Sequence, residues 1–116
     1  MRVGIDCIDI SRIEKSIEIP TFLERIFSES EMAMFTQKKM NPQTIAGNFA
    51  AKEAFSKSLG TGIRGFKLKE VSILRDELGA PYIELTGKAA ELANGLKFTV
   101  SITHTDTVAT AIVIAY

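Results

Sequence analysis

The sequence has 116 residues, 46% hydrophobic and 24% charged, and its 14 basic side chains balance its 14 acidic ones. This length fits one domain spanning residues 1–116, and the zero net charge argues against a general nucleic-acid binder, which usually carries a basic excess. No stretch reaches the roughly 18 apolar residues that span a bilayer, and a single cysteine suits a reducing compartment. We therefore expect a cytoplasmic protein that binds neither nucleic acid nor a membrane.

Capping signals predict the helices of the first half. Asp9, Ser28 and Asn41 each stand where an N-cap residue would begin a helix, and Ser28 with Glu31 forms a capping-box pattern. Gly60 stands just after the end of the longest predicted helix. The predicted elements are a strand over 3–8, then helices over 10–16, from 20, over 29–38 and over 42–59.

Alternating side chains predict strands in the second half. A hairpin is expected from residues 68–75 and 81–85, joined by the turn 76–79, and an alanine-rich helix over 87–94 follows. Two further strands, over 98–103 and 108–115, complete the chain. This order predicts an α+β fold, with a mainly antiparallel sheet packed with a long helix and shorter helices.

Two carboxylates, those of Asp6 and Glu53, are candidate metal ligands. Asp6 interrupts an apolar strand, where a charge is costly unless a metal, a salt bridge or exposure at the strand end compensates it. Glu53 lies on a helical stripe with a spacing of four, made of Ile45, Phe49, Glu53 and Lys57. The simplest interpretations are a strand-end charge and a surface Glu–Lys pair. The alternative is that both acids face a cleft and hold Mg²⁺, which binds few carboxylates together with phosphate oxygens.

Other residues carry weaker signals. The glycines after Lys57, Gly60 and Gly62, would let the backbone approach a ligand closely, but many helix C-termini have the same sequence. His104, the only histidine, is most simply a hydrogen-bonded or exposed residue, and no zinc site is expected. We expect Cys7 to point to the strand face opposite Asp6 and to act as a small core residue.

Several of these segments together resemble one family. They are the Gly-x-Asp motif and following arginine over 3–13, the helical stretch over 22–31, the helix and glycine-rich turn over 46–62, the hairpin with Gly-Ala-Pro at 79–81, and Ser-Ile-Thr-His over 101–104. In this order they resemble the small holo-[acyl-carrier-protein] synthases, which are 4′-phosphopantetheinyl transferases. The resemblance covers most of the chain and implies the fold of that family.

The resemblance also implies a reaction, in which the phosphopantetheine group of coenzyme A moves to a serine of apo acyl carrier protein and releases adenosine 3′,5′-bisphosphate. It implies Mg²⁺ bound by Asp6 and Glu53, with Lys57 as a third catalytic residue that neutralises phosphate charge. It further implies a homotrimer with active sites between subunits, working in the cytoplasm in fatty acid biosynthesis and lipid metabolism. The residues expected to line the coenzyme A site are Lys57, Gly60, Thr61 and His104, and those expected to contact the carrier protein are Arg12 and Arg25.

One residue departs from the family pattern. Many members carry arginine where this chain has Asn48, so a phosphate contact would be lost unless Lys38 or Lys39 replaces it. An alternative function is a non-catalytic module that binds coenzyme A, a nucleotide or carrier protein on the same scaffold. A structural oligomer subunit is a third possibility. Neither of these two alternatives explains why Asp6 and Glu53 should both be present.

Overall fold

The computed structural model describes residues 1–116 and has five strands, five α-helices and one short 3₁₀ helix. In chain order these are β1 (Arg2–Asp9), α1 (Ile10–Ile17), α2 (Pro20–Ile26), α3 (Glu29–Gln37), α4 (Pro42–Ser58), η1 (Leu68–Glu70), β2 (Val71–Arg75), β3 (Pro81–Leu85), α5 (Gly87–Ala93), β4 (Phe98–His104) and β5 (Val108–Ala115). The predicted α+β class is confirmed.

All strand pairs are antiparallel, but they form two sheets instead of one. The larger sheet has the order β1-β5-β4, so the two edge strands both pair with the last strand of the chain. The second sheet is the hairpin of β2 and β3, which lies beside β4 without joining its hydrogen-bond ladder.

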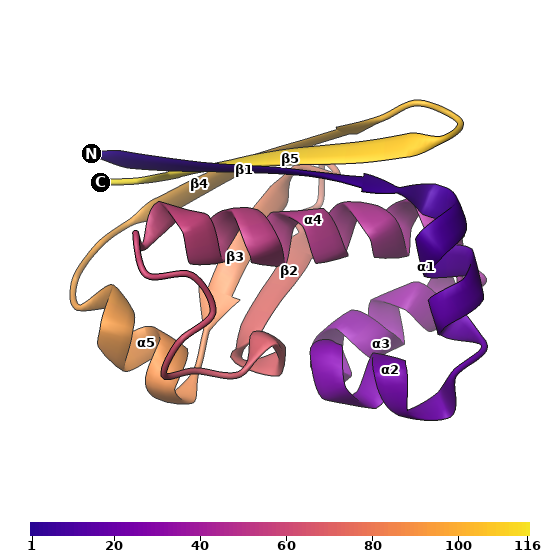
Figure 1. The fold of residues 1–116 in the computed structure, drawn as a ribbon, viewed down its shortest axis with the longest axis horizontal. Coiled ribbons are helices and arrows are strands. Elements are labelled where there is room, and N and C mark those ends of the chain that lie inside the picture. Colours follow the sequence, from indigo (N-terminus) through magenta and orange to yellow (C-terminus); the bar gives the residue numbers. More distant parts are fainter.

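Helix α4 lies against one face of the three-stranded sheet, as Figure 1 shows, with α1 to α3 grouped at one end and the β2–β3 hairpin and α5 beneath it. Its fully buried side chains include Ile45 and Phe55, which join a core cluster of 21 residues. The opposite face of the sheet carries no helix. None of the helices combines the length and apolarity needed to cross a bilayer.

The predicted helix ends are largely confirmed. Ser28 and Glu31 form the complete capping box, the Asn41 side chain accepts from the first turn of α4, and Gly60 follows its C-cap with φ +78°. Asp9 occupies the N-cap of α1 without a side-chain capping bond. Strand β2 begins at Val71, three residues later than predicted, because the Glu70 carboxylate accepts from the backbone N–H of Lys67 and closes a 3₁₀ turn.

A buried polar cluster joins α3, α4 and the start of the hairpin. Glu31 and Lys52 have fully buried side chains and form an ion pair, and the Lys52 ammonium also donates to the carbonyls of Leu68 and Val71. The second carboxylate oxygen of Glu31 accepts from Asn48 at 3.0 Å. Burial raises the pKa of Glu31, whereas the charge and hydrogen bond of Lys52 lower it. Every buried polar side-chain atom of the protein has a hydrogen-bond partner.

Candidate functional site

A glycine brings β1 into close contact with α4. Gly4 is buried, and a Cβ built on it would overlap the carbonyl oxygen of Ala54 and lie 2.7 Å from the backbone nitrogen of Ser58. Only glycine therefore allows this approach. Because alternate residues of a strand share one face, Asp6, two residues later, is directed to the same side of the sheet as α4.

Asp6 lies at the edge of the sheet, beside the C-terminal half of the α4 stripe, which consists of Glu53 and Lys57. The Lys57 ammonium lies 3.2 Å from a carboxylate oxygen of Asp6 and donates to the Ile5 carbonyl at 2.9 Å. The Asp6 side chain is 19% exposed and that of Lys57 is 54% exposed, so the pair sits at the surface. Glu53, one helical turn before Lys57, is half-buried beside them. The structure thus brings together the three residues that the sequence singled out.

The electrostatics of this group suit a cation. Burial raises the pKa of Glu53, the negative charge of Asp6 raises it further, and Lys57 opposes both effects. Glu53 itself forms no ion pair, and no group of three or more potential metal-ligating side chains occurs in the chain. Two mutually repelling carboxylates fit Mg²⁺, because this ion uses one or two protein carboxylates and fills its other positions with water and substrate phosphate.

The remaining predicted ligand-binding residues divide into two groups. Gly60 and Thr61 follow α4 directly, one turn beyond Lys57, and both are exposed. His104 pairs with Ala109 at the end of β4, whereas Asp6 pairs with Ala111 from β1 on the other side of the central strand. The ring Nδ1 of His104 lies 3.0 Å from the Thr105 carbonyl oxygen. His104 therefore does not meet the carboxylates within one chain.

Comparison with known proteins identifies the family. A family model described as the 4′-phosphopantetheinyl transferase superfamily matches residues 2–112. The chain belongs to this superfamily. A holo-[acyl-carrier-protein] synthase of Clostridium botulinum (strain Alaska E43 / Type E3) is 47% identical over 116 residues, covering 96% of this chain and 94% of the relative.

Solved structures of other superfamily members show the same fold. The Helicobacter pylori holo-[acyl-carrier-protein] synthase in complex with coenzyme A has a TM-score of 0.87 and 35% identity, covering 98% of this chain and 99% of the other. The enzyme of that name from Neisseria meningitidis has a TM-score of 0.91 and 29% identity, with 99% and 97% coverage. The fold expected from the motifs is thereby confirmed.

One expectation about an individual side chain needs correction, and the residue that departs from the family pattern has a structural role in this superfamily member. Cys7 is exposed on the outer face of the sheet, not in the core, because no helix covers that face. Asn48 is fully buried, and its amide donates to Glu31 and the Ile73 carbonyl while its oxygen accepts from Arg75 at 2.9 Å. The Asn48 side chain is thus part of the buried polar cluster and does not reach the surface.

Sequence reasoning missed two contributors to the site. The first is Gly4, which entered only as part of the Gly-x-Asp motif; a glycine inside a strand was the available signal for a close backbone approach. The second is Lys52, which directly precedes Glu53 and anchors the buried side of α4. A charged residue four positions after Asn48 on an otherwise alanine-rich helix face was the signal for a buried polar cluster.

Proposed function

We propose that this protein transfers the 4′-phosphopantetheine group of coenzyme A to a serine of apo acyl carrier protein and releases adenosine 3′,5′-bisphosphate, in a reaction that depends on Mg²⁺. The observation that supports this most directly is the group of Asp6, Glu53 and Lys57 at the junction of β1 and α4. A binding module has no need of two carboxylates that repel each other beside a phosphate ligand.

Asp6 and Glu53 would hold Mg²⁺, which when bound neutralises charge on the pyrophosphate. The protein's own contribution is to position charge. Lys57 is paired with Asp6, but once a cation satisfies Asp6 its ammonium is free to donate to a phosphate oxygen. Its flexible and half-exposed side chain suits this exchange. Gly60 and Thr61, one turn later, line the path along which the rest of the donor extends.

A homotrimer would complete the site. The outer face of the sheet exposes apolar side chains, with Val3 59%, Ile5 57% and Ile112 37% exposed, and Ile5 pairs directly with Ile112. Such a patch is typical of a protein–protein interface. Association through this face would allow His104 of a neighbouring subunit to complete the coenzyme A site that one chain leaves open.

Carrier protein would dock on the helices beyond the site. Arg12 on α1 and Arg25 on α2 are both exposed, and guanidinium groups suit an acidic partner surface. The work of the enzyme would be the activation of carrier protein for fatty acid biosynthesis in the cytoplasm. The single, exposed thiol of Cys7 is compatible with a reducing compartment.

The test is a transfer assay with the whole protein, coenzyme A, Mg²⁺ and apo acyl carrier protein, read by mass spectrometry of the carrier. Wild-type protein should add one phosphopantetheine group, and addition of EDTA should abolish the transfer. Asp6→Asn and Glu53→Gln should each remove most activity, whereas Glu91→Gln, an exposed carboxylate on α5, should not. Coenzyme A binding without transfer would favour the non-catalytic module, and full activity of both site variants would refute the metal ligands.

A further inference from the structure

Three asparagines occur in the chain, and their surroundings differ. Asn41 precedes a proline, Asn48 a phenylalanine and Asn94 a glycine. An asparagine side chain loses ammonia when the backbone nitrogen of the next residue attacks its amide carbon, which makes asparagine one of the thermolabile residues of proteins. The reaction requires a mobile side chain, a free N–H on the next residue, and room for the two groups to meet.

Two of the asparagines are protected from this reaction. The residue after Asn41 is proline, which has no N–H, and the Asn41 side-chain oxygen accepts from the backbone N–H groups of Gln43 and Thr44. Asn48 is fully buried, and three hydrogen bonds of 2.9 to 3.0 Å hold its side chain. Neither side chain can turn toward the backbone nitrogen that follows it without breaking these bonds.

Asn94 meets all three requirements. It follows α5 in the left-handed conformation, with φ +43° and ψ +55°, as is common at the end of a helix, and both Asn94 and Gly95 are exposed. The side-chain hydrogen bonds of asparagine in this chain belong to Asn41 and Asn48, so the Asn94 amide is free. The Gly95 N–H donates to no backbone carbonyl, and a Cβ built on Gly95 would meet nothing within 4 Å.

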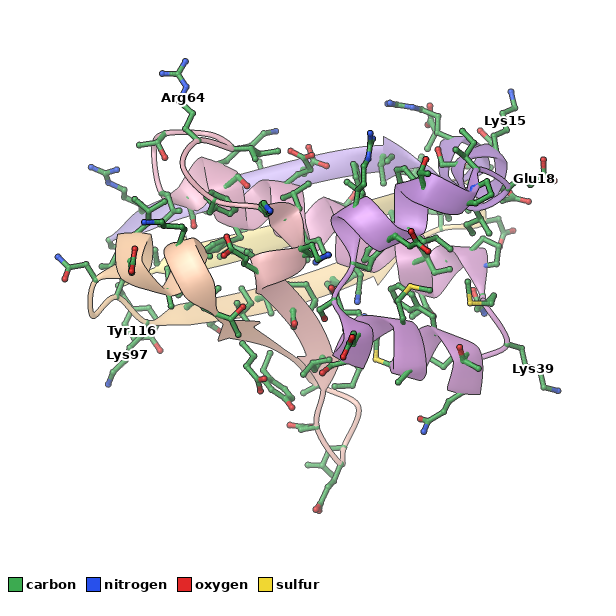
Figure 2. The ribbon with its side chains drawn as sticks, turned by 90° about the horizontal axis from the view of Figure 1, so that it is seen from below. Lys15, Glu18, Lys39, Arg64, Lys97 and Tyr116 are labelled. Atoms are coloured by element: carbon green, nitrogen blue, oxygen red, sulfur yellow. The ribbon has the colours of Figure 1, made fainter.

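The turn that contains Asn94 is also weakly held. Two backbone hydrogen bonds cross it, from the Asn94 N–H to the Ala90 carbonyl at 3.4 Å and from the Leu96 N–H to the Ala93 carbonyl at 2.9 Å. Attack on the amide carbon requires rotation about the ψ angle of Asn94, and exposed helix ends open locally at low cost. Figure 2 labels Lys97, the residue after Leu96, at the end of the molecule opposite Lys39.

We propose that Asn94 is a site of spontaneous deamidation. The Gly95 nitrogen gives up its proton and bonds to the side-chain carbonyl carbon of Asn94. The bond from that carbon to the amide nitrogen then breaks, and the amide group leaves with the proton as ammonia. Water opens the resulting succinimide ring at either of its two carbonyl carbons. The products are aspartate, with the backbone unchanged, and isoaspartate, in which the backbone is one methylene longer.

The two products differ in their effect on the turn. Both change the net charge from zero to minus one, and the new carboxylate lies at a hollow that Asn94 shares with Arg2. Aspartate tolerates the left-handed conformation as asparagine does, so it preserves the turn. Isoaspartate lengthens the turn, so the Leu96 N–H no longer reaches the Ala93 carbonyl and the C-terminal end of α5 loosens.

Incubation of the full protein in neutral and in mildly alkaline buffer, followed by peptide mapping with mass spectrometry, tests the proposal without any substrate. Asn94 should convert to both acids, whereas Asn41 and Asn48 should remain amides. The rate at Asn94 should rise about tenfold for each pH unit, since the attacking group is the deprotonated form of a very weak acid. Asn94→Gln is the matched variant and should keep its amide, because its longer side chain forms the ring less readily.

Two comparisons make the proposal refutable. Conversion of Asn94 in urea but not in the folded protein would mean that the turn protects it, and would overturn the proposal. Conversion of Asn48 at the rate of Asn94 would also overturn it, because burial and hydrogen bonding would then not select the site. Hydrogen exchange separates the products: the Leu96 amide should exchange faster in the isolated isoaspartyl form than in Asn94→Asp, and equal exchange would refute the loosening of α5.

Discussion

Replacement of Lys52 by methionine should destabilise the protein severely, although no ion pair or hydrogen bond joins the Lys52 side chain to Asp6 or Glu53. Methionine keeps most of the length of lysine but removes the ammonium that pairs with Glu31 and donates to two backbone carbonyls. Breaking one side of a fully buried pair costs about 3–5 kcal/mol, because the other charge is left uncompensated. This is a large part of the 5–15 kcal/mol that typically separates folded from unfolded protein.

Denaturant unfolding followed by circular dichroism measures this loss, with the chain concentration held constant because association would stabilise the folded state. The matched control is Lys88→Met, which breaks a pair with Glu91 whose two side chains are each 70% exposed. An exposed pair contributes about 0–1 kcal/mol, so this variant should resemble wild type. Glu31→Gln combined with Lys52→Met should recover more than about 1 kcal/mol relative to Lys52→Met, since no buried charge remains.

The loss of stability in Lys52→Met should also depend on pH. Burial raises the pKa of Glu31 and Lys52 opposes that rise, so the pKa of Glu31 in Lys52→Met should be higher still. A folded-state pKa above the unfolded value means that the variant's stability is greatest below the unfolded pKa and declines as pH rises through the folded pKa. The stability deficit of the variant relative to wild type should thus grow as pH rises above about 4, the pKa of a glutamate in the unfolded chain. A pH-independent deficit, or one no larger than that of Lys88→Met, would refute a buried ion pair.

Three other substitutions probe the site and its surroundings. Gly4→Ala should lower the free energy of unfolding by about 3 kcal/mol in denaturant titrations, since its Cβ would overlap the Ala54 carbonyl. The control Gly79→Ala lies in open space and is strained only by its φ of +87°, so it should cost about 1–2 kcal/mol. Equal losses in the two variants would contradict the close approach of β1 to α4. Ile5→Glu should reduce the sedimentation coefficient of the assembled protein, and an unchanged value would place self-association elsewhere. Lys57→Met should raise the KM for coenzyme A about tenfold through loss of one charge-assisted hydrogen bond, with unchanged far-ultraviolet circular dichroism; an unaltered KM would exclude the phosphate contact.

Local hydrogen-bond requirements explain why the element ends were predictable. The N–H groups of a first helical turn need acceptors near in sequence, and Ser28 and Asn41 supply them, just as Gly60 supplies the positive φ after α4. Asp6 and Glu53 were each ambiguous from spacing alone. Their meeting depends on packing between two distant segments, so it was expected only through the ordered family motifs.

Non-local packing explains what the sequence did not reveal. Glu31 and Lys52 are 21 positions apart and lie on different helices, so nothing in either segment indicates that they form an ion pair. Cys7 was placed in the core because strand alternation distinguishes two faces but does not say which faces are covered. Asn48 was interpreted from the family pattern. Its burial depends on contacts with Ile73 and Arg75, which lie in β2, a distant segment of the sequence.

The order of the strands in the larger sheet has a consequence for synthesis of the protein on the ribosome. The central strand, β5, pairs with β1 and β4, yet it emerges after every other strand. Until Val108–Ala115 is made, β1 has no partner and presents apolar residues and an open edge, which invite aggregation. Nascent chains arrested before residue 108 should therefore be protease-sensitive and bound by chaperones, and the native topology should form only after β5 has left the ribosome.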